Sequence, residues 1–256
     1  MSQPAFEMIN SILDIWKIVI QAIMFLVLWA AAFRGKKGKM DGIAAVLFIL
    51  ANIGIGFLPC AGWVRYGVSA FAIMGYAGIC YKKKIEKAVF VMLAFYNLHC
   101  LGYSMASSIY EKVMSAMMKS IDFLRDSYLQ EVNQCMAVGM FCLTFSYSVL
   151  FVAMTLILYR LMKDVTIMAW QDVILLSILN LVGSMITKII VGLLTVKIDD
   201  ELFILFDEKP DLLWKMPLVA VLIFAGEAAL IYFWQRYRIL LAERQKHFVE
   251  EQQVKA

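Results

Sequence analysis

The chain has few charged residues and few residues that break helices. Only 17% of its 256 residues are charged, and it contains four prolines, two histidines and five dispersed cysteines. Soluble domains carry about a quarter charged residues, so a soluble globular enzyme and a disordered chain are excluded. The scattered cysteines exclude a disulfide scaffold. What the sequence has instead is apolar residues, which make up 62% of it and predict an integral membrane protein.

Catalytic and ligand-binding signatures are missing as well. The chain has no H-E-x-x-H, Walker or G-x-S-x-G motif and no cysteine pair at zinc-binding spacing. We therefore expect no enzymatic activity, no bound metal and no cofactor. The net charge of +4 does not indicate a nucleic-acid partner, because the basic residues lie in short clusters between apolar runs.

Seven apolar segments approach the roughly 20 residues that a helix needs to cross a bilayer. We predict an all-α, polytopic bundle of about seven spans over residues 1–234 and a cytoplasmic helix over residues 235–256. The second and third segments are short, and one re-entrant hairpin is the alternative for them. The seven segments are Ile12–Phe33, Ile43–Leu58, Tyr66–Tyr81, Ala88–Ala106, Met136–Leu158, Val173–Val196 and Met216–Trp234.

Basic residues are distributed unequally between the two ends of these segments. Fifteen lie in the connections after the first, third and fifth segments and in the tail, and seven lie on the other side. Four of the fifteen, the last being Lys87, form the short cluster after the third segment. Positively charged short loops remain in the cytoplasm. This predicts a multi-pass plasma-membrane protein with its N-terminus outside and its C-terminus inside.

Two further segments are predicted to be amphipathic helices. Ser107–Asn133 either continues the fourth span or lies along the bilayer, because apolar residues recur there at helical spacing. They are Ile109, Val113, Met117, Ile121, Leu124, Tyr128 and Val132. The tail continues the last span without Pro or Gly, and Trp234, Leu241 and Phe248 recur every seven residues. That spacing predicts the seam of a homodimeric coiled coil.

The outer segment Lys197–Lys215 is rich in acidic residues around a short apolar patch. Leu202, Phe203, Phe206 and Asp207 are the candidate ligand-sensing residues in it. Apolar groups ringed by acidic ones suit a peptide that is apolar with some positive charge. The alternative is a loop that packs on its own bundle.

Charged residues inside the spans are costly in lipid, and we expect them to be paired. Asp14 and Lys17 are three residues apart on one face of the first span. Lys188 and Glu227 lie in the sixth and seventh spans at depths about one helical turn apart, a distance that a lysine covers. Such groups serve as structural contacts, as a ligand-responsive switch or as a proton relay.

Asn97 and His99 lie in the middle of the fourth span. A metal site there would need further ligands from other spans, and none occurs at suitable spacing. We therefore predict that both residues form interhelical hydrogen bonds.

The last third of the chain resembles a known receptor family. The resemblance rests on Trp170–Ser177 (WQDVILLS), Phe206–Pro210 (FDEKP), Tyr237–Lys246 (YRILLAERQK) and Glu250–Gln253 (EEQQ). These stretches are similar to the membrane sensor module of Firmicute histidine kinases with a GHKL-type ATPase, a group that includes receptors for cyclic quorum-sensing peptides.

The resemblance implies a homodimer that senses an extracellular peptide or small molecule and signals through its last helix. The family's phosphoacceptor motif is absent, since His247 has different neighbours, and a kinase domain would have to follow Ala256.

Two other classes of protein remain possible from the sequence. A small-solute transporter or channel subunit usually shows repeats and broken helices, which are not visible here. A structural assembly factor would keep a stable hetero-partner.

Overall fold

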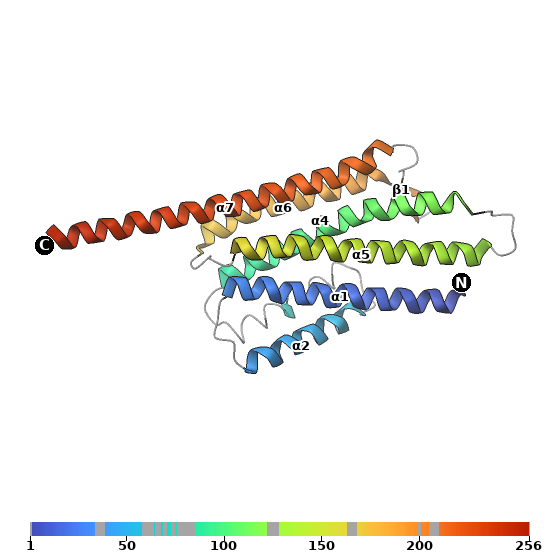
Figure 1. The fold of residues 1–256 in the computed structure, drawn as a ribbon, viewed down its shortest axis with the longest axis horizontal. Coiled ribbons are helices and arrows are strands. Elements are labelled where there is room, and N and C mark those ends of the chain that lie inside the picture. The colour runs from blue at the N-terminus through green and yellow to red at the C-terminus, as the bar shows by residue number, and fades with distance from the viewer. Residues whose placement is uncertain are drawn as a thin grey trace.

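The computed structural model is a bundle of long helices. It describes residues 2–33, 39–57, 64, 68, 71–72, 75, 85–121, 128–162, 168–198, 201–204 and 210–255. The helices lie side by side, and the last one extends far beyond the others at the C-terminal end (Figure 1). The elements are α1 (Gln3–Phe33), α2 (Lys39–Gly56), α4 (Ile85–Met118), α5 (Tyr128–Met162), α6 (Trp170–Leu194), β1 (Thr195–Ile198), β2 (Glu201–Ile204) and α7 (Pro210–Lys255).

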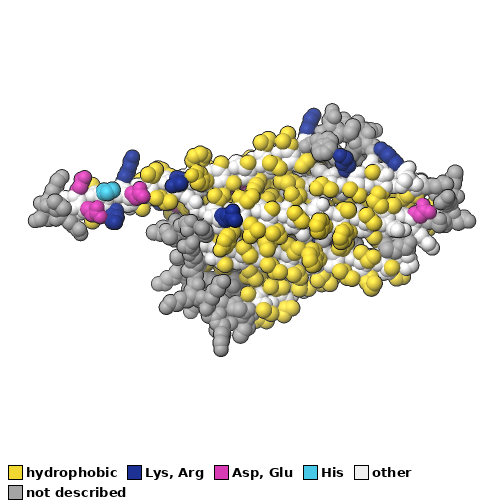
Figure 2. All heavy atoms as spheres, viewed as in Figure 1, with side chains coloured by type: hydrophobic (Ala, Val, Ile, Leu, Met, Phe, Trp, Pro, Cys, Tyr) yellow, Lys and Arg dark blue, Asp and Glu magenta, His cyan; other side chains and the backbone are white. Residues whose placement is uncertain are grey.

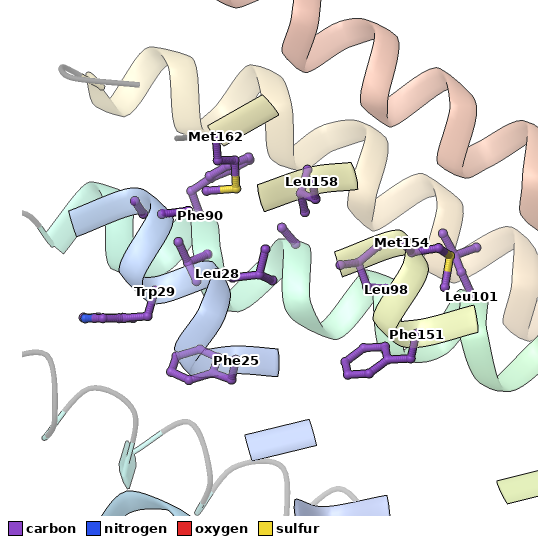
Figure 3. Packing of buried hydrophobic residues seen from close by; sticks show 14 of the residues in the cluster. Phe25, Leu28, Trp29, Phe90, Leu98, Leu101, Phe151, Met154, Leu158 and Met162 are labelled. Atoms are coloured by element: carbon purple, nitrogen blue, oxygen red, sulfur yellow. The ribbon is translucent and has the colours of Figure 1, made fainter. Parts of the chain in front are cut away.

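Helix α4 lies at the centre of the bundle, in contact with α1, α5, α6 and α7. Its buried apolar residues recur at helical spacing and face the other helices. The fully buried side chains of α1, α4 and α5 interdigitate to form the core (Figure 3). They include Phe25, Leu28, Trp29, Phe90, Leu98, Leu101, Phe151, Leu158 and Met162.

The outer surface of the bundle is apolar. Along α5, the side chains of Phe141, Phe145 and Val149 follow one another at four-residue spacing and are each more than half exposed. Figure 2 shows hydrophobic side chains covering the body of the bundle, with charged ones at its ends and along the tail. Such an apolar surface is stable in lipid and not in water.

Among the described residues, four helices are long and apolar enough to cross a membrane. They comprise residues Gln3–Phe33, Glu86–Met118, Tyr128–Met162 and Lys215–Glu251. Helices α2 and α6 contribute two shorter apolar stretches, Ala45–Gly56 and Trp170–Gly183, within the residues whose side chains the structure describes. The predicted third span, Tyr66–Tyr81, lies outside the described residues apart from isolated helical positions. The prediction of a helical membrane fold is confirmed.

The prediction of one helix over Ser107–Asn133 is wrong. Helix α4 continues the fourth span as far as Met118, and a turn follows it. The residues from Tyr128 onward belong to α5 instead. The expected apolar stripe is also rotated, since Ile109 is 43% exposed while Met114 is buried. Packing against α5 determines which face of α4 is buried. The regular spacing of apolar residues alone does not indicate that face.

The sixth predicted span ends earlier than expected, at Leu194. Thr195 and Val196 instead begin an antiparallel hairpin, in which Thr195 pairs with Ile204 and Ile198 with Glu201. β-Branched residues favour strands, and Thr195, Val196 and Ile198 are all of this kind. The apolar patch that we predicted in this loop therefore begins in a strand.

Lys87, which we predicted in a basic loop, lies in the first turn of α4 and is buried. Its ammonium group donates a hydrogen bond to the carbonyl of Ala32 at 3.3 Å. That carbonyl belongs to the last turn of α1, where the helix dipole is negative. The lysine therefore stabilises the C-terminus of α1.

Gly183 allows α6 to approach α7 closely. A β-carbon at this position would lie 2.5 Å from the Cγ2 methyl of Ile223 in α7 and 3.5 Å from Asn97 Oδ1. We expect Gly183→Ala to lower the free energy of unfolding by about 1–3 kcal/mol, because a branched residue cannot move aside. Chemical unfolding in detergent micelles measures this.

The matched control is Gly54→Ala, at a helical position where nothing lies within 4 Å of the added β-carbon. That change should be neutral or stabilise the chain by up to about 1 kcal/mol through helix propensity. If Gly183→Ala is as stable as Gly54→Ala, the helices are not held at this distance.

Candidate functional site

Asp172 organises the start of α6. It is the third residue of that helix, and its Oδ2 accepts a hydrogen bond from the N–H of Ala169 at 2.8 Å. In return the N–H groups of Asp172 and Val173 donate to the Ala169 carbonyl at 3.0 and 3.1 Å. A carboxylate that reaches back from the third helical position to the capping residue stabilises a helix N-terminus, as does its negative charge there.

The same carboxylate holds α7. Trp234 Nε1 donates to Asp172 Oδ1 at 2.9 Å, and the Arg238 guanidinium forms an ion pair with Oδ2. Trp234 and Arg238 are one helical turn apart, and the guanidinium carbon lies 5.9 Å from the centroid of the Trp234 ring. We call Asp172, Trp234 and Arg238 the exit cluster. It ties the beginning of α6 to the point where α7 leaves the bundle.

Helix α5 contacts α7 at the same level. The side-chain amide of Gln235 donates to the carbonyl of Leu161, close to the end of α5 at Met162. Beyond Leu241, every residue of α7 up to Glu251 is exposed. Among the described residues, the exit cluster and Gln235 therefore make the last polar contacts of α7 with the bundle before its exposed part begins.

A second polar contact lies deeper in the bundle. Asn97 Nδ2 in α4 donates to Glu227 Oε2 in α7 at 2.7 Å. Both residues are buried, with at most 1% of their surface exposed. A carboxylate in such a position requires hydrogen bonds, and the Asn97 amide supplies one.

A third contact joins α1, α4 and α5. Gln21 Nε2 donates to Tyr147 Oη at 3.0 Å and lies 3.2 Å from His99 Nδ1, which is 2.8 Å from Tyr147 Oη. His99 Nδ1 thus links α4 to the Gln21 amide of α1 and to the Tyr147 phenol of α5. Predicted interhelical hydrogen bonds from Asn97 and His99 are thus confirmed.

The other predicted pair in α1 also forms. Lys17 Nζ lies 2.7 Å from Asp14 Oδ1, and the two side chains are 19% and 49% exposed. This pair lies in the N-terminal half of α1, whereas the exit cluster lies at the end of the bundle where α1 has its C-terminus (Figure 1). The structure does not bring the two together.

Several predicted residues lie outside the part of the chain whose side chains the structure describes. Phe206 and Asp207 fall between the described ranges, and Leu202 and Phe203 are described only as backbone of β2. The Lys188 side chain is not described either, so its pairing with Glu227 stays a prediction.

The structure changes the predicted dimer seam. Trp234 is only 7% exposed and its indole is bonded to Asp172 within the same chain, so it is not available to a second chain. Phe248 is 62% exposed and Leu241 is partly exposed. These two remain as candidates.

The sequence did not predict Asp172 or Arg238 as site residues. Both occur only within the stretches on which the family resemblance rests. Two signals were present. An acidic residue in the first turn of an apolar helix marks a helix N-terminus. Trp and Arg one turn apart at the end of a span mark the membrane boundary.

These contacts and the apolar outer surface define the chain as a helical membrane protein with polar contacts between its helices. Comparison with family models, with curated proteins and with solved structures finds no match.

Proposed function

We propose that this chain is the membrane-embedded input module of a two-component sensor histidine kinase. The observation that supports it most is α7, a single helix of 46 residues from Pro210 to Lys255. It begins six residues after β2, runs along α4 and α6, and continues beyond the bundle (Figure 1). A continuous helix transmits rotation or translation along its whole length.

The proposed orientation places the N-terminus and the hairpin outside the plasma membrane and the tail in the cytoplasm, with about seven spans. The unequal distribution of basic residues supports it. The two chain ends also lie at opposite ends of the structure (Figure 1). In this orientation the exit cluster lies at the inner surface.

The ligand in this proposal is an extracellular peptide or small molecule that contacts the patch around Leu202, Phe203, Phe206 and Asp207. A ligand shifts the equilibrium between two positions of α7 only by the difference in its affinity for them. The exit cluster would hold one position, because its ion pair and indole hydrogen bond depend on the rotation of α7. In a homodimer, Leu241 and Phe248 of two tails would face each other.

The test joins the catalytic domain of a sensor histidine kinase to Ala256 and measures autophosphorylation in proteoliposomes, without any ligand. We expect Asp172→Ala to change the kinase activity severalfold, because α7 loses its attachment to α6. With a Gly-Gly insertion after Arg238, this dependence on Asp172 should disappear. Each glycine costs about 1 kcal/mol of helix and adds backbone freedom.

An Ala-Ala insertion at the same point is the matched control. It adds the same length and rotation but keeps the helix, so the kinase activity should still respond to Asp172→Ala. Equal activity of all these fusions would show that the tail is a solvated extension and does not transmit a signal.

A further inference from the structure

Two exposed arginines, one in α5 and one in α7, are chain neighbours of the residues that join these two helices. Arg160 precedes Leu161, whose carbonyl accepts the hydrogen bond from Gln235, and Arg236 follows Gln235. We call Arg160 and Arg236 the arginine pair. Because each is the chain neighbour of a bonded residue, the two guanidinium groups emerge from adjacent helices at the same level of the bundle.

Neither arginine is neutralised within the described part of the chain. Ion pairs there involve other residues, among them Asp14 with Lys17, Asp172 with Arg238, and Glu250 with Lys246 and His247. Arg236 Nε donates to Tyr232 Oη at 3.2 Å, and its guanidinium carbon lies 5.5 Å from the Tyr232 ring centroid. This contact orients the guanidinium and leaves its charge available.

The surroundings of the arginine pair mark the membrane boundary. Towards the middle of the bundle, the same two helices expose apolar side chains such as Ile157 and Leu222. Exposed aromatic residues gather at the level of the pair, as they do where a membrane protein passes the lipid headgroups. They are Tyr159, Trp170, Tyr232 and Tyr237.

We infer that the arginine pair binds the headgroup of an anionic phospholipid at the level where α5 ends beside α7. A guanidinium binds phosphate oxygens through two parallel hydrogen bonds, and two of them favour a headgroup with net negative charge. Phosphatidylcholine carries the same phosphate but neutralises it with its own choline. The bound lipid would lie beside Gln235 and close to the exit cluster, because Arg238 is two residues further along α7.

The experiment uses the full chain in micelles containing equal amounts of phosphatidylglycerol and phosphatidylcholine with the same acyl chains. Native mass spectrometry counts the lipids that remain bound after release from the micelle. We expect phosphatidylglycerol to be retained preferentially. Arg160→Gln and Arg236→Gln should each weaken this retention about fivefold, the factor that corresponds to roughly 1 kcal/mol per basic residue near an anionic surface.

Arg244→Gln is the matched control, since Arg244 is exposed on the free part of α7, and it should leave retention unchanged. Arg160→Lys with Arg236→Lys keeps the charge and should fall between wild type and the glutamine variants. Circular dichroism confirms that each variant is folded.

Three results would overturn the inference. They are equal retention of both lipids by the wild type, equal loss on Arg244→Gln, and unchanged retention when both arginines are replaced by glutamine. Competition by glycerol 3-phosphate separates the two sources of phosphate. If it displaces phosphatidylglycerol at millimolar concentration, the pair recognises the phosphate group alone and the site is not specific for a lipid.

Discussion

Replacing Asn97 by Leu is expected to lower the free energy of unfolding by about 2–3 kcal/mol, the amount typical of a lost hydrogen bond to a buried charged group. Its amide is 2.7 Å from the Glu227 carboxylate, and both residues are buried. Glu227→Gln should cost less, because an amide oxygen still accepts from Asn97. Unfolding of the purified chain by a denaturing detergent measures both.

The predicted partner Lys188 adds a second test at this site. If its ammonium group pairs with Glu227, Lys188→Met alone should cost about 3–5 kcal/mol, since it leaves a buried charge behind. Adding Glu227→Gln should recover much of that loss. A double variant whose loss equals the sum of the two single losses would show that Lys188 and Glu227 do not interact.

Thr155→Val provides the control for both tests. Thr155 is fully buried in α5, and its hydroxyl has no hydrogen-bond partner within the described residues. Removing that hydroxyl should be neutral or stabilising, because no bond is lost with it. A loss as large as that of Asn97→Leu would mean that any polar-to-apolar change in this core is damaging.

Asp172→Ala is expected to detach α7 from the beginning of α6. The change leaves the Ala169 N–H, the Trp234 indole and the Arg238 guanidinium without their acceptor. We expect a loss of about 2–3 kcal/mol, chiefly from the buried indole and the helix cap. Arg238 is 38% exposed, so hydration of its guanidinium compensates for most of the lost ion pair with Asp172.

Hydrogen exchange resolves where this energy is lost. The amides of α7 from Trp234 onward should exchange faster in Asp172→Ala, while those around Glu227 should be unchanged. Trp234→Phe removes one hydrogen bond and keeps the ion pair, so its effect should be about 1 kcal/mol. Unchanged exchange beyond Trp234 in Asp172→Ala would mean that the exit cluster does not anchor the helix.

Much of the fold followed from hydropathy alone. The long apolar runs predicted the helices, and the absence of Pro or Gly after Trp234 predicted the continuous α7. Where the prediction was wrong, contacts between distant segments decided the result. The buried face of α4 near Met114 depends on α5, which packs so closely there that a β-carbon on Gly139 would lie 2.4 Å from the Met114 sulfur.

The site was less predictable than the fold, because its residues come together only when the helices pack. The spacing of Trp234 and Leu241 is equally compatible with a coiled-coil seam and with an inward-facing indole. The Trp234 indole faces inward because Asp172, 62 residues earlier in the chain, accepts its hydrogen bond. Glu227 was correctly expected to need a partner, but no spacing rule connects it with Asn97, which lies 130 residues away.

The length of the helices also determines how far the protein rises above the bilayer. Helices α1, α4 and α5 have 31, 34 and 35 residues. Upright, they measure about 47–53 Å, whereas a bilayer with both headgroup layers is about 40–45 Å thick. If the arginine pair fixes one end at headgroup level, the surplus emerges at the other. Glu111, Lys112 and Glu131 lie at that end, so α4 and α5 would form a short charged platform above the lipid.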